Sequence, residues 1–306
     1  MVCTRPIEGY RAPGGQIVFA KKHGWCDLPI TVPCGQCNGC RLEKSRQWAM
    51  RIMHEASLYE DNVFLTLTYR DEELPEHQSL RLEHWQLFMK RLKKAYGGKS
   101  LRFYHCGEYG EQTHRPHYHA IIFNHDFGDK TYLKETETGS KLYISSTLDR
   151  IWSHGDCYIG SVTFESAAYC GRYVMKKLTG ARKSEYGSRV PEYSTMSRRP
   201  GIGSPWLAKW KRDCYPNDFC IMNGRKIRVP KAYDQLMIGA ESKIGEWVTD
   251  HTGYPVWKPS IKSTPMELLK RKRIRSAAKH SDNQTRDRLD VIEELTQLRV
   301  DRLTRS

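Results

Sequence analysis

Apolar and polar positions alternate in several short runs of the chain, whereas other stretches carry apolar residues at helical spacing. "NVFLTLTY" (62–69) is rich in β-branched and aromatic residues with alternating threonines, which predicts a strand. "SLRLEHWQLFMKRLKKAYGG" (79–98) has its large apolar residues on one side of a helix and ends at two glycines. "LRFYHCGEYG" (101–110) and "PHYHAIIFN" (116–124) predict two strands joined by a polar loop, which is a β-hairpin.

The same patterns continue before and after this central part. Helices are predicted over 41–61, 146–155 and 165–178, a strand over 156–164, and a polar insertion over 126–141. From the first predicted strand on, the order is strand, helix, strand, strand, helix, strand, helix. This mixed order with an adjacent hairpin predicts an α+β fold, in which helices pack on a central antiparallel sheet.

The two ends of the chain differ in composition from the middle. Residues 1–60 comprise a Gly-, Pro- and Cys-rich segment and a first helix, which we expect to pack on a core of residues 61–180. Residues 181–306 form a basic extension, at first rich in Pro and Gly, which predicts an extended segment that contacts phosphates. The cationic run "LLKRKRIRSAAKH" (268–280) and a tail with apolar residues at helical spacing follow. The extension is therefore expected to contact DNA, to offer a helix to a partner, or both.

Charge adds a class of partner to this picture. Fifty Lys and Arg against 35 Asp and Glu give a net charge of +15, which favours a polyanionic nucleic acid as partner over a merely basic protein. No stretch approaches the roughly eighteen uninterrupted apolar residues of a membrane span. The first residues, "MVCTRPIEGYRAPGG", lack the apolar segment of a signal peptide. We therefore expect a protein of a reducing cytoplasm without membrane contact, whose ten cysteines are thiols or metal ligands.

Three of these cysteines, Cys34, Cys37 and Cys40, form a C-x2-C-x2-C motif. The spacing indicates a metal site, with Zn²⁺ as the default and a structural role in pinning the N-terminal segment against the following helix. An iron–sulfur cluster would also suit thiolates, and unligated thiols in a Gly-rich turn are the alternative. Either metal needs a fourth ligand. The candidates are Cys3, Cys26 and His23.

Two histidines, His117 and His119, stand in the predicted strand 116–124. Residues two apart on a strand face the same side, so the two imidazoles point together and are able to hold one divalent cation. The predicted hairpin would bring Glu108 roughly opposite His117, and Glu111 in the loop is the other candidate for a third ligand. Two imidazoles and a carboxylate suit Mg²⁺, Mn²⁺ or a transition metal and leave positions open for substrate oxygens. The alternative is a pair of strand histidines without metal.

The stretch "YCGRYVMKK" (169–177) places Tyr169, Tyr173 and Lys176 on one face of a predicted helix. A tyrosine phenol is able to attack a phosphodiester and form a covalent phosphotyrosine, which allows the cut strand to be rejoined later without ATP. This reaction needs a cation at the scissile phosphate, and a nearby lysine would stabilise the phenolate or the leaving oxygen. Two tyrosines would permit a second cut while the first is bonded to a DNA 5′ end. The alternative is an aromatic stripe that packs on the sheet.

Taken in order, "FLTLTY" (64–69), "RPHYHAIIF" (115–123) and "YCGRYVMKK" resemble the three motifs of the HUH endonuclease superfamily of rolling-circle replication initiators, in its two-tyrosine branch. The segment "PCGQCNGCRLEKSRQWAMRIMHEA" (33–56) is similar to one typical of the initiators of gokushovirus-type microviruses, which are single-stranded DNA phages. The resemblance covers roughly residues 1–210. It implies that the α+β fold is that of an HUH endonuclease, with a ferredoxin-like or RRM-like core.

The resemblance also implies roles for the candidate residues. The implied ligands of a catalytic Mg²⁺ or Mn²⁺ are His117 and His119, whereas Glu108 as third ligand rests on the hairpin argument. Tyr169 and Tyr173 would be the nucleophiles, assisted by Lys176. One departure is that the residue between the histidines is usually aliphatic or otherwise hydrophobic in the family, whereas here it is Tyr118, which would point to the opposite, core-facing side.

The implied activity is site-specific nicking and rejoining of single-stranded DNA through a 5′-phosphotyrosine, which starts and ends rolling-circle replication of a phage genome in the host bacterial cytoplasm. Its partners would be single-stranded DNA, double-stranded origin DNA, and a host helicase and DNA polymerase, since the sequence contains no P-loop motif. A plasmid initiator, a transposase or a relaxase would share this chemistry. A zinc-stabilised nucleic-acid-binding protein without catalysis is the alternative from another class.

Overall fold

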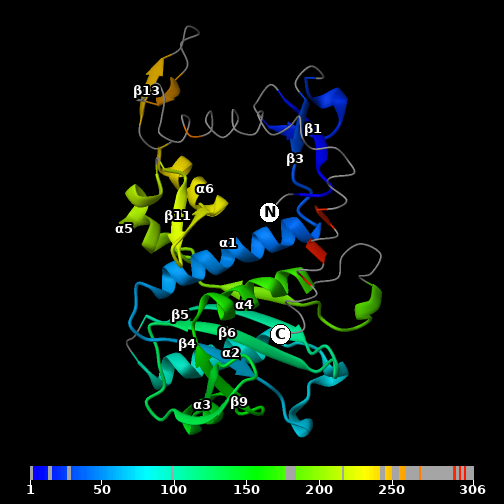
Figure 1. The fold of residues 1–306 in the computed structure, drawn as a ribbon, viewed down its shortest axis with the longest axis vertical. Coiled ribbons are helices and arrows are strands. Elements are labelled where there is room, and N and C mark those ends of the chain that lie inside the picture. The colour runs from blue at the N-terminus through cyan, green and yellow to red at the C-terminus, as the bar shows by residue number, and fades with distance from the viewer. Residues whose placement is uncertain are drawn as a thin grey trace. The chain divides into compact units, whose positions relative to one another are not determined.

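The central feature of the fold is a seven-stranded sheet in the order β10-β5-β6-β4-β9-β8-β7, in which neighbouring strands are antiparallel (Figure 1). It is seen in a computed structural model of the chain. The structure describes residues 3–12, 16–25, 29–97, 100–176, 184–215, 217–241, 245–249, 255–259, 269, 292–293, 296–297 and 300. For residues 173–176, 239–241, 245–249 and 255–259 the description covers the backbone alone.

The elements follow one another along the chain with the following bounds. The strands of the central sheet are β4 (Asn62–Leu67), β5 (Arg102–Tyr109), β6 (Pro116–Phe123), β7 (Thr131–Glu135), β8 (Lys141–Ile144), β9 (Cys157–Ser161) and β10 (Tyr193–Met196). The helices are α1 (Asn38–Ala56), α2 (Leu82–Ala95), α3 (Ser146–Trp152), α4 (Phe164–Lys176), α5 (Ser204–Cys214) and α6 (Lys231–Glu241). The smaller sheets consist of β1 (Ile7–Arg11), β2 (Ile17–Val18) and β3 (Pro29–Val32), of β11 (Phe219–Met222) and β12 (Arg225–Arg228), and of β13 (Gly245–Thr249) and β14 (Pro255–Pro259).

One face of the central sheet packs on α2 and α3. Every second side chain of β4 and β6 points to this face, as the alternation along a strand requires. The helices contribute large apolar residues from the side that the sequence pattern predicted to be buried. Side chains in this layer include Leu65, Tyr118, Trp85, Phe88 and Trp152, each at most 2% exposed.

The other face of the sheet packs on α1 and α4 (Figure 1). The intervening residues of β5 and β6 point to this side, and small residues of the two helices lie against them. The buried side chains of this layer include Cys106, Ile121, Phe123, Ala49 and Ala167. Because helices cover both faces of an antiparallel sheet, the predicted α+β class is confirmed.

A close approach between α1 and α4 fixes the position of α4. The Ser45 hydroxyl donates a hydrogen bond to the carbonyl oxygen of Ala168, with 3.1 Å between the oxygens. A Cβ added at Gly171 would lie 2.9 Å from the carbonyl oxygen of Ser45, which is closer than side-chain carbons come to backbone oxygens. The two helices are therefore in contact at a site that only glycine fits.

The sheet extends beyond the strands that the sequence pattern predicted. The predicted polar insertion over 126–141 contains most of the β7–β8 hairpin, which adds two strands at one edge. Strand β10 follows residue 180 and pairs with β5 at the other edge. Every residue of β7 is exposed, so this strand has no buried face to produce an alternating pattern.

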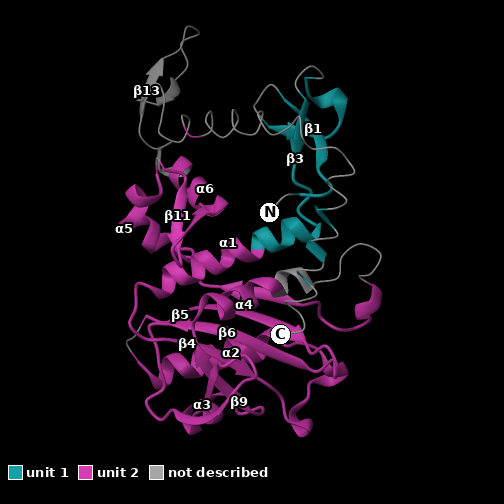
Figure 2. Cartoon of the chain, viewed as in Figure 1, with its two compact units in different colours: residues 1–44, 275–306 teal, residues 45–274 magenta. Residues whose placement is uncertain are grey.

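The chain divides into two units, one of residues 1–44 and 275–306 and the other of residues 45–274 (Figure 2). Unit 2 contains the seven-stranded sheet, its covering helices and a further apolar cluster between α1, α5, α6 and the β11–β12 hairpin. Unit 1 contains the sheet β2-β1-β3, which lies in a segment expected to be mostly coil. The domain boundaries predicted at residues 60 and 180 stay predictions.

Within unit 1, residues near the C-terminus contact the N-terminal segment. Arg5 Nε lies 3.2 Å from Glu293 Oε2, and the Asn38 side-chain amide donates a hydrogen bond of 2.5 Å to Gln297 Oε1. The cationic run 268–280 lies outside the described residues apart from Leu269. Among the described helices, none has both the length and the apolar character that crossing a membrane requires.

Candidate active site

The β5–β6 hairpin sets the positions of three of the predicted ligands. The strands pair so that Glu108 lies directly opposite His117, as the sequence predicted. The turn between them is closed by a hydrogen bond of 3.0 Å from the Gly110 N–H to the Arg115 carbonyl oxygen. Because a register shift of one residue would send these side chains to opposite faces, the strand pairing by itself brings Glu108 and His117 together.

Three potential ligand atoms converge on the α4 side of this hairpin. Glu108 Oε1 lies 2.6 Å from His117 Nε2 and 3.0 Å from His119 Nε2. One ligand atom from each of the three residues lies within 4.8 Å of the others, which is a spacing that one cation could bridge. Glu111, the other candidate from the sequence, is exposed in the loop and does not belong to this group.

Burial and charge act in opposite directions on Glu108. The residue is 2% exposed, and burial by itself would raise the pKa of its carboxyl group. The hydrogen bonds to His117 and His119 outweigh burial and lower that pKa to about 2. The site therefore holds a carboxylate anion at neutral pH, which is the form that ligates a cation.

The remaining ring nitrogens of the two histidines are held by neighbouring groups. His117 Nδ1 lies 3.2 Å from the Arg115 carbonyl oxygen, which only accepts, so this nitrogen carries the proton of a neutral ring and leaves Nε2 for a cation. His119 Nδ1 lies 3.1 Å from Thr66 Oγ1 on the adjacent strand β4. Sequence reasoning assigned Thr66 no chemistry, although the alternating threonines of the predicted strand were a signal for a polar position on this face.

Solvent reaches the three residues unequally. The side chain of His117 is 19% exposed, whereas those of His119 and Glu108 are 6% and 2% exposed. The ring of Phe64 stacks on His119, with centroids 5.6 Å apart and 8° between the planes. The open side of the group is therefore the side of His117.

Helix α4 brings one of the two predicted tyrosines to this group. Tyr169 is half-buried, and its ring centroid lies 5.0 Å from that of His119 in an edge-to-face contact. The guanidinium carbon of Arg172 lies 5.7 Å from the centroid of Tyr169, within the range of a cation–π contact. Sequence reasoning missed Arg172, although it lies three positions after Tyr169 and so on the same side of the helix. The side chains of Tyr173 and Lys176 lie outside the described residues.

Tyr118, the departure from the family pattern, lies on the opposite face of the sheet. It is fully buried in the layer beneath α2 and α3. Its hydroxyl lies 2.9 Å from that of Tyr69 and accepts a hydrogen bond of 2.9 Å from the Arg81 N–H. The expectation that this residue points away from the two histidines is confirmed.

The predicted cysteine site is assembled within unit 1. The sulfur atoms of the three motif cysteines lie within 4.8 Å of one another and of Cys3 Sγ, which was one of the candidates for a fourth ligand. Of the other candidates, His23 does not belong to this group and Cys26 lies outside the described residues. The site contains Cys3, Cys34, Cys37 and Cys40.

Comparison with known proteins assigns the chain to a family. Residues 62–178 match a family of replication-associated proteins described by the name ORF2, and this range contains all three sequence motifs. The chain is 36% identical over 242 residues to replication-associated protein VP4 of Bdellovibrio phage phiMH2K, covering 76% of each chain. It is 32% identical over 260 residues to replication-associated protein ORF2 of Spiroplasma virus 4, covering 78% of this chain and 80% of that protein.

A more distant relative is replication-associated protein ORF4 of Chlamydia phage 1, at 25% identity over 228 residues, which are 72% of this chain and 57% of that protein. No solved structure matches the chain. The chain belongs to the family of phage replication-associated proteins, and its resemblance to gokushovirus-type replication initiators is confirmed.

Proposed function

We propose that this protein is a metal-dependent tyrosine endonuclease and DNA strand transferase of the HUH type, which initiates and terminates rolling-circle replication of a phage genome. The observation that carries the proposal is the contact between Tyr169 and His119, with ring centroids 5.0 Å apart. It supports a reaction in which a phenol and a cation-bound phosphate meet. The names of the relatives favour a phage genome over a plasmid or a transposon as the replicated DNA.

The donor set fits a divalent cation. Two imidazole nitrogens and one carboxylate oxygen suit Mg²⁺ or Mn²⁺, and Glu108, His117 and His119 would hold it. Three protein ligands would leave further coordination positions for phosphate oxygens. When bound, the cation would polarise the scissile phosphate and offset the negative charge that develops on its oxygens.

The residues of this chain would carry out the remaining steps. Tyr169 Oη would attack phosphorus and lose its proton, while the bond from phosphorus to the 3′ oxygen breaks and that oxygen takes up a proton. The products are a free 3′-hydroxyl and a 5′ phosphate bonded to tyrosine. One phosphodiester replaces another, so the 5′ end is kept ready for rejoining.

The second tyrosine and the lysine of the last motif complete the proposed cycle. Lys176 would stabilise the charge on the phenolate or the leaving oxygen. Tyr173 follows Tyr169 by four positions in α4 and would cut the regenerated origin after one round of synthesis. The released strand would then be circularised by attack of its 3′-hydroxyl on the first phosphotyrosine.

The proposed partners follow from this cycle. The net charge of +15 supports binding to single-stranded DNA and to the double-stranded origin. A host helicase and DNA polymerase would separate the strands and extend the free 3′-hydroxyl. Replication of a phage genome would place the protein in the host bacterial cytoplasm.

The test is formation of a covalent protein–DNA adduct. The full chain is incubated with Mn²⁺ and labelled single-stranded oligonucleotides that together cover the origin region of its own genome, and adducts are resolved under denaturing conditions. We expect a protein-linked band that Tyr169→Phe strongly diminishes. Tyr132→Phe is the matched control, because Tyr132 is an exposed tyrosine of β7. The absence of any adduct with the wild-type protein would favour the alternative of a nucleic-acid-binding protein without catalysis.

A further inference from the structure

Unit 1 has very little apolar core. None of the three buried hydrophobic clusters contains a described residue of this unit. Among its described residues, only Cys37 and Leu42 are buried apolar side chains. Several of its large apolar residues are exposed instead, including Phe19 at 61% and Trp25 at 45%. A folded unit of this size needs another source of stability, such as a disulfide or a structural metal.

The four cysteines of unit 1 are placed for a single metal ion and not for disulfides. All four are free thiols. Cys3 Sγ lies 3.6 Å from Cys34 Sγ and 3.8 Å from Cys37 Sγ, and all four sulfur atoms lie within 4.8 Å of one another. A tetrahedron with zinc–sulfur bonds of about 2.3 Å has edges of about 3.8 Å, so these separations fit one central ion. An iron–sulfur cluster binds its cysteines through different iron atoms and would hold the sulfurs farther apart.

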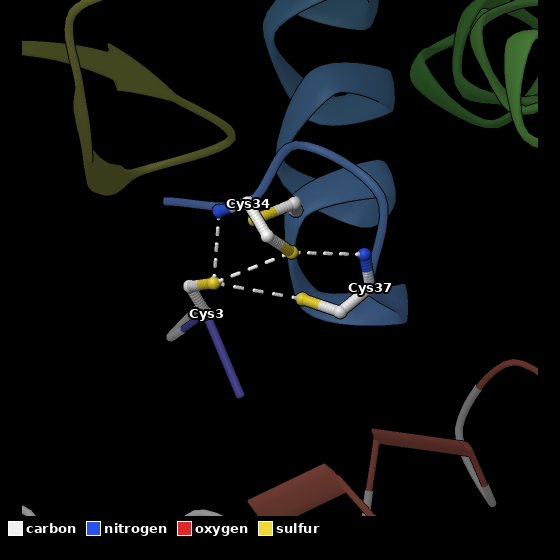
Figure 3. A group of neighbouring side chains, drawn as sticks. Cys3, Cys34 and Cys37 are labelled. Carbon is white, nitrogen blue, oxygen red and sulfur yellow. Dashed lines mark hydrogen bonds between the residues drawn. The ribbon is translucent and has the colours of Figure 1, made fainter. Parts of the chain in front are cut away.

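The sulfur atoms point toward one another and receive backbone hydrogen bonds (Figure 3). The Cys34 N–H donates to Cys3 Sγ over 3.3 Å, and the N–H groups of Gln36 and Cys37 donate to Cys34 Sγ over 3.4 and 3.3 Å. Gly35 has a φ of +75°, a conformation that glycine adopts without strain and that turns these N–H groups toward the sulfur. Such donors stabilise thiolates, which are the form that binds metal.

The positions of the four cysteines also indicate what a metal would do. Cys3 precedes β1, Cys34 and Cys37 follow β3, and Cys40 lies in the first turn of α1. One ion would therefore join the two ends of the segment that forms the sheet β2-β1-β3. Four protein ligands leave no coordination position for a substrate, which is the mark of a structural site.

We propose that Cys3, Cys34, Cys37 and Cys40 bind one Zn²⁺ ion and that this ion holds unit 1 in its folded state. The site is separate from the Glu108–His117–His119 group and does not depend on the proposed endonuclease activity. Removal of zinc is expected to release the sheet β2-β1-β3. It is also expected to loosen the contacts of Arg5 with Glu293 and of Asn38 with Gln297, since Arg5 and Asn38 each lie within two residues of a ligand.

The experiment measures metal content and metal environment in the purified full chain. Elemental analysis is expected to give one zinc per chain after dialysis against a weak chelator. Co²⁺ exchanged into this site is expected to show the strong sulfur-to-cobalt charge-transfer absorption of a tetrathiolate, which imidazole and carboxylate ligands do not produce. Cys3→Ser and Cys40→Ser should each retain less than about a tenth of an equivalent of zinc.

Three further variants keep the result interpretable. Cys157→Ser changes a buried cysteine of β9 in unit 2 and should keep both the zinc and the cobalt absorption. Cys26→Ser should keep them too, because the structure assigns the fourth position to Cys3. Cys3→His supplies a different ligand at the same position. It should keep zinc while shifting the cobalt spectrum toward three sulfurs and one nitrogen, even if the serine variants fail to fold.

Hydrogen exchange provides a readout of the structural role. Amides of residues 3–44 should exchange at least about tenfold faster in Cys3→Ser than in the wild type, whereas those of β5 and β6 should be unchanged. Wild-type protein without zinc and without cobalt–thiolate absorption would overturn the proposal. So would the absorption of an iron–sulfur cluster in freshly purified protein, or loss of zinc in Cys26→Ser with retention in Cys3→Ser.

Discussion

The two groups of candidate metal ligands in this protein sit in opposite kinds of surroundings. Glu108, His117 and His119 project from strands in which seven of eight residues are buried, between two layers of helices. The four cysteines project from a segment whose strands are largely exposed. In the first region the packed sheet positions the ligands, whereas in the second the ligands are expected to hold the backbone. A similar set of residues thus serves function in one place and stability in the other.

This difference has a physical origin in the number of contacts that fix each ligand. On the sheet, the register of β5 with β6 and the contacts of His119 with Thr66 and Phe64 determine where the imidazole points before any cation binds. Around the cysteines, the fixed points are one tight turn and the first turn of α1. We therefore expect the two sites to respond differently to metal removal, pH and substitution.

The largest expected effect comes from chelation of the catalytic cation. Treatment with EDTA, at a concentration that leaves the zinc in place, should lower the rate of adduct formation by on the order of 10³-fold or more, because the phosphate is no longer polarised. Thermal unfolding of unit 2, followed by tryptophan fluorescence, should be unchanged, and added Mn²⁺ should restore the activity. Unfolding of the sheet on chelation would contradict the view that the fold positions these ligands.

Glu108→Gln tests the charge of the sheet site. It keeps the size of the side chain but removes the negative charge, and we expect adduct formation to fall by about 100-fold at saturating Mn²⁺. The pKa of Glu108 is lowered to about 2, so its carboxylate stays ionised as the pH falls from 8 to 5. The loss should therefore be the same across this range. Glu111→Gln in the exposed loop is the matched control and should retain activity.

A pH effect on stability should arise within unit 2 independently of metal. Burial lowers the pKa of His54 to about 4; its Nδ1 lies 2.9 Å from the Tyr233 hydroxyl, and its ring stacks on Trp206. The unfolded chain takes up a proton at this residue below a pH of about 6.5, which the folded chain does only near pH 4. The free energy of unfolding should thus fall by about 2 kcal/mol between pH 7 and pH 5.

Urea unfolding at the two pH values measures this change. His54→Gln should reduce the difference between pH 7 and pH 5, whereas Cys3→Ser should leave it unaltered, since it changes the other unit. An equal pH dependence in the wild type and in His54→Gln would show that another group is responsible.

The smallest expected effect concerns the orientation of His119. Thr66→Val removes the hydroxyl that lies 3.1 Å from His119 Nδ1, and we expect half-maximal activity to require roughly tenfold more Mn²⁺, with little change at saturation. Thr68→Val is the matched control, because the Thr68 hydroxyl instead donates to the Asp156 carbonyl oxygen. Titration of activity with Mn²⁺ in both variants distinguishes positioning of the ligand from general damage to the sheet.

Much of the sheet site could be predicted because strand periodicity is a local property. The spacing of His117 and His119 put both on one face, and a short loop put Glu108 opposite His117. Thr66 and Arg172 were missed because their roles depend on which strand and which ring lie next to them, which a single segment does not reveal.

Other parts of the fold could not be read from the pattern. Strand β7 is exposed along its whole length, and β10 has four half-buried residues, so neither shows the alternation that identifies a strand. The sheet β2-β1-β3 lies in a Gly- and Pro-rich segment whose sequence resembles coil. The choice of Cys3 among three candidate ligands required three dimensions, because its distance along the chain from Cys34 gives no hint of contact.

The absence of a single methyl group has a mechanical consequence for the nucleophile. Helix α4 can rest on Ser45 only because residue 171 has no Cβ. Any larger residue would lift the helix from α1 and carry the phenol ring two positions earlier along with it. The reach of Tyr169 toward the imidazole of His119 is thus set from behind, by how deeply one helix settles against another.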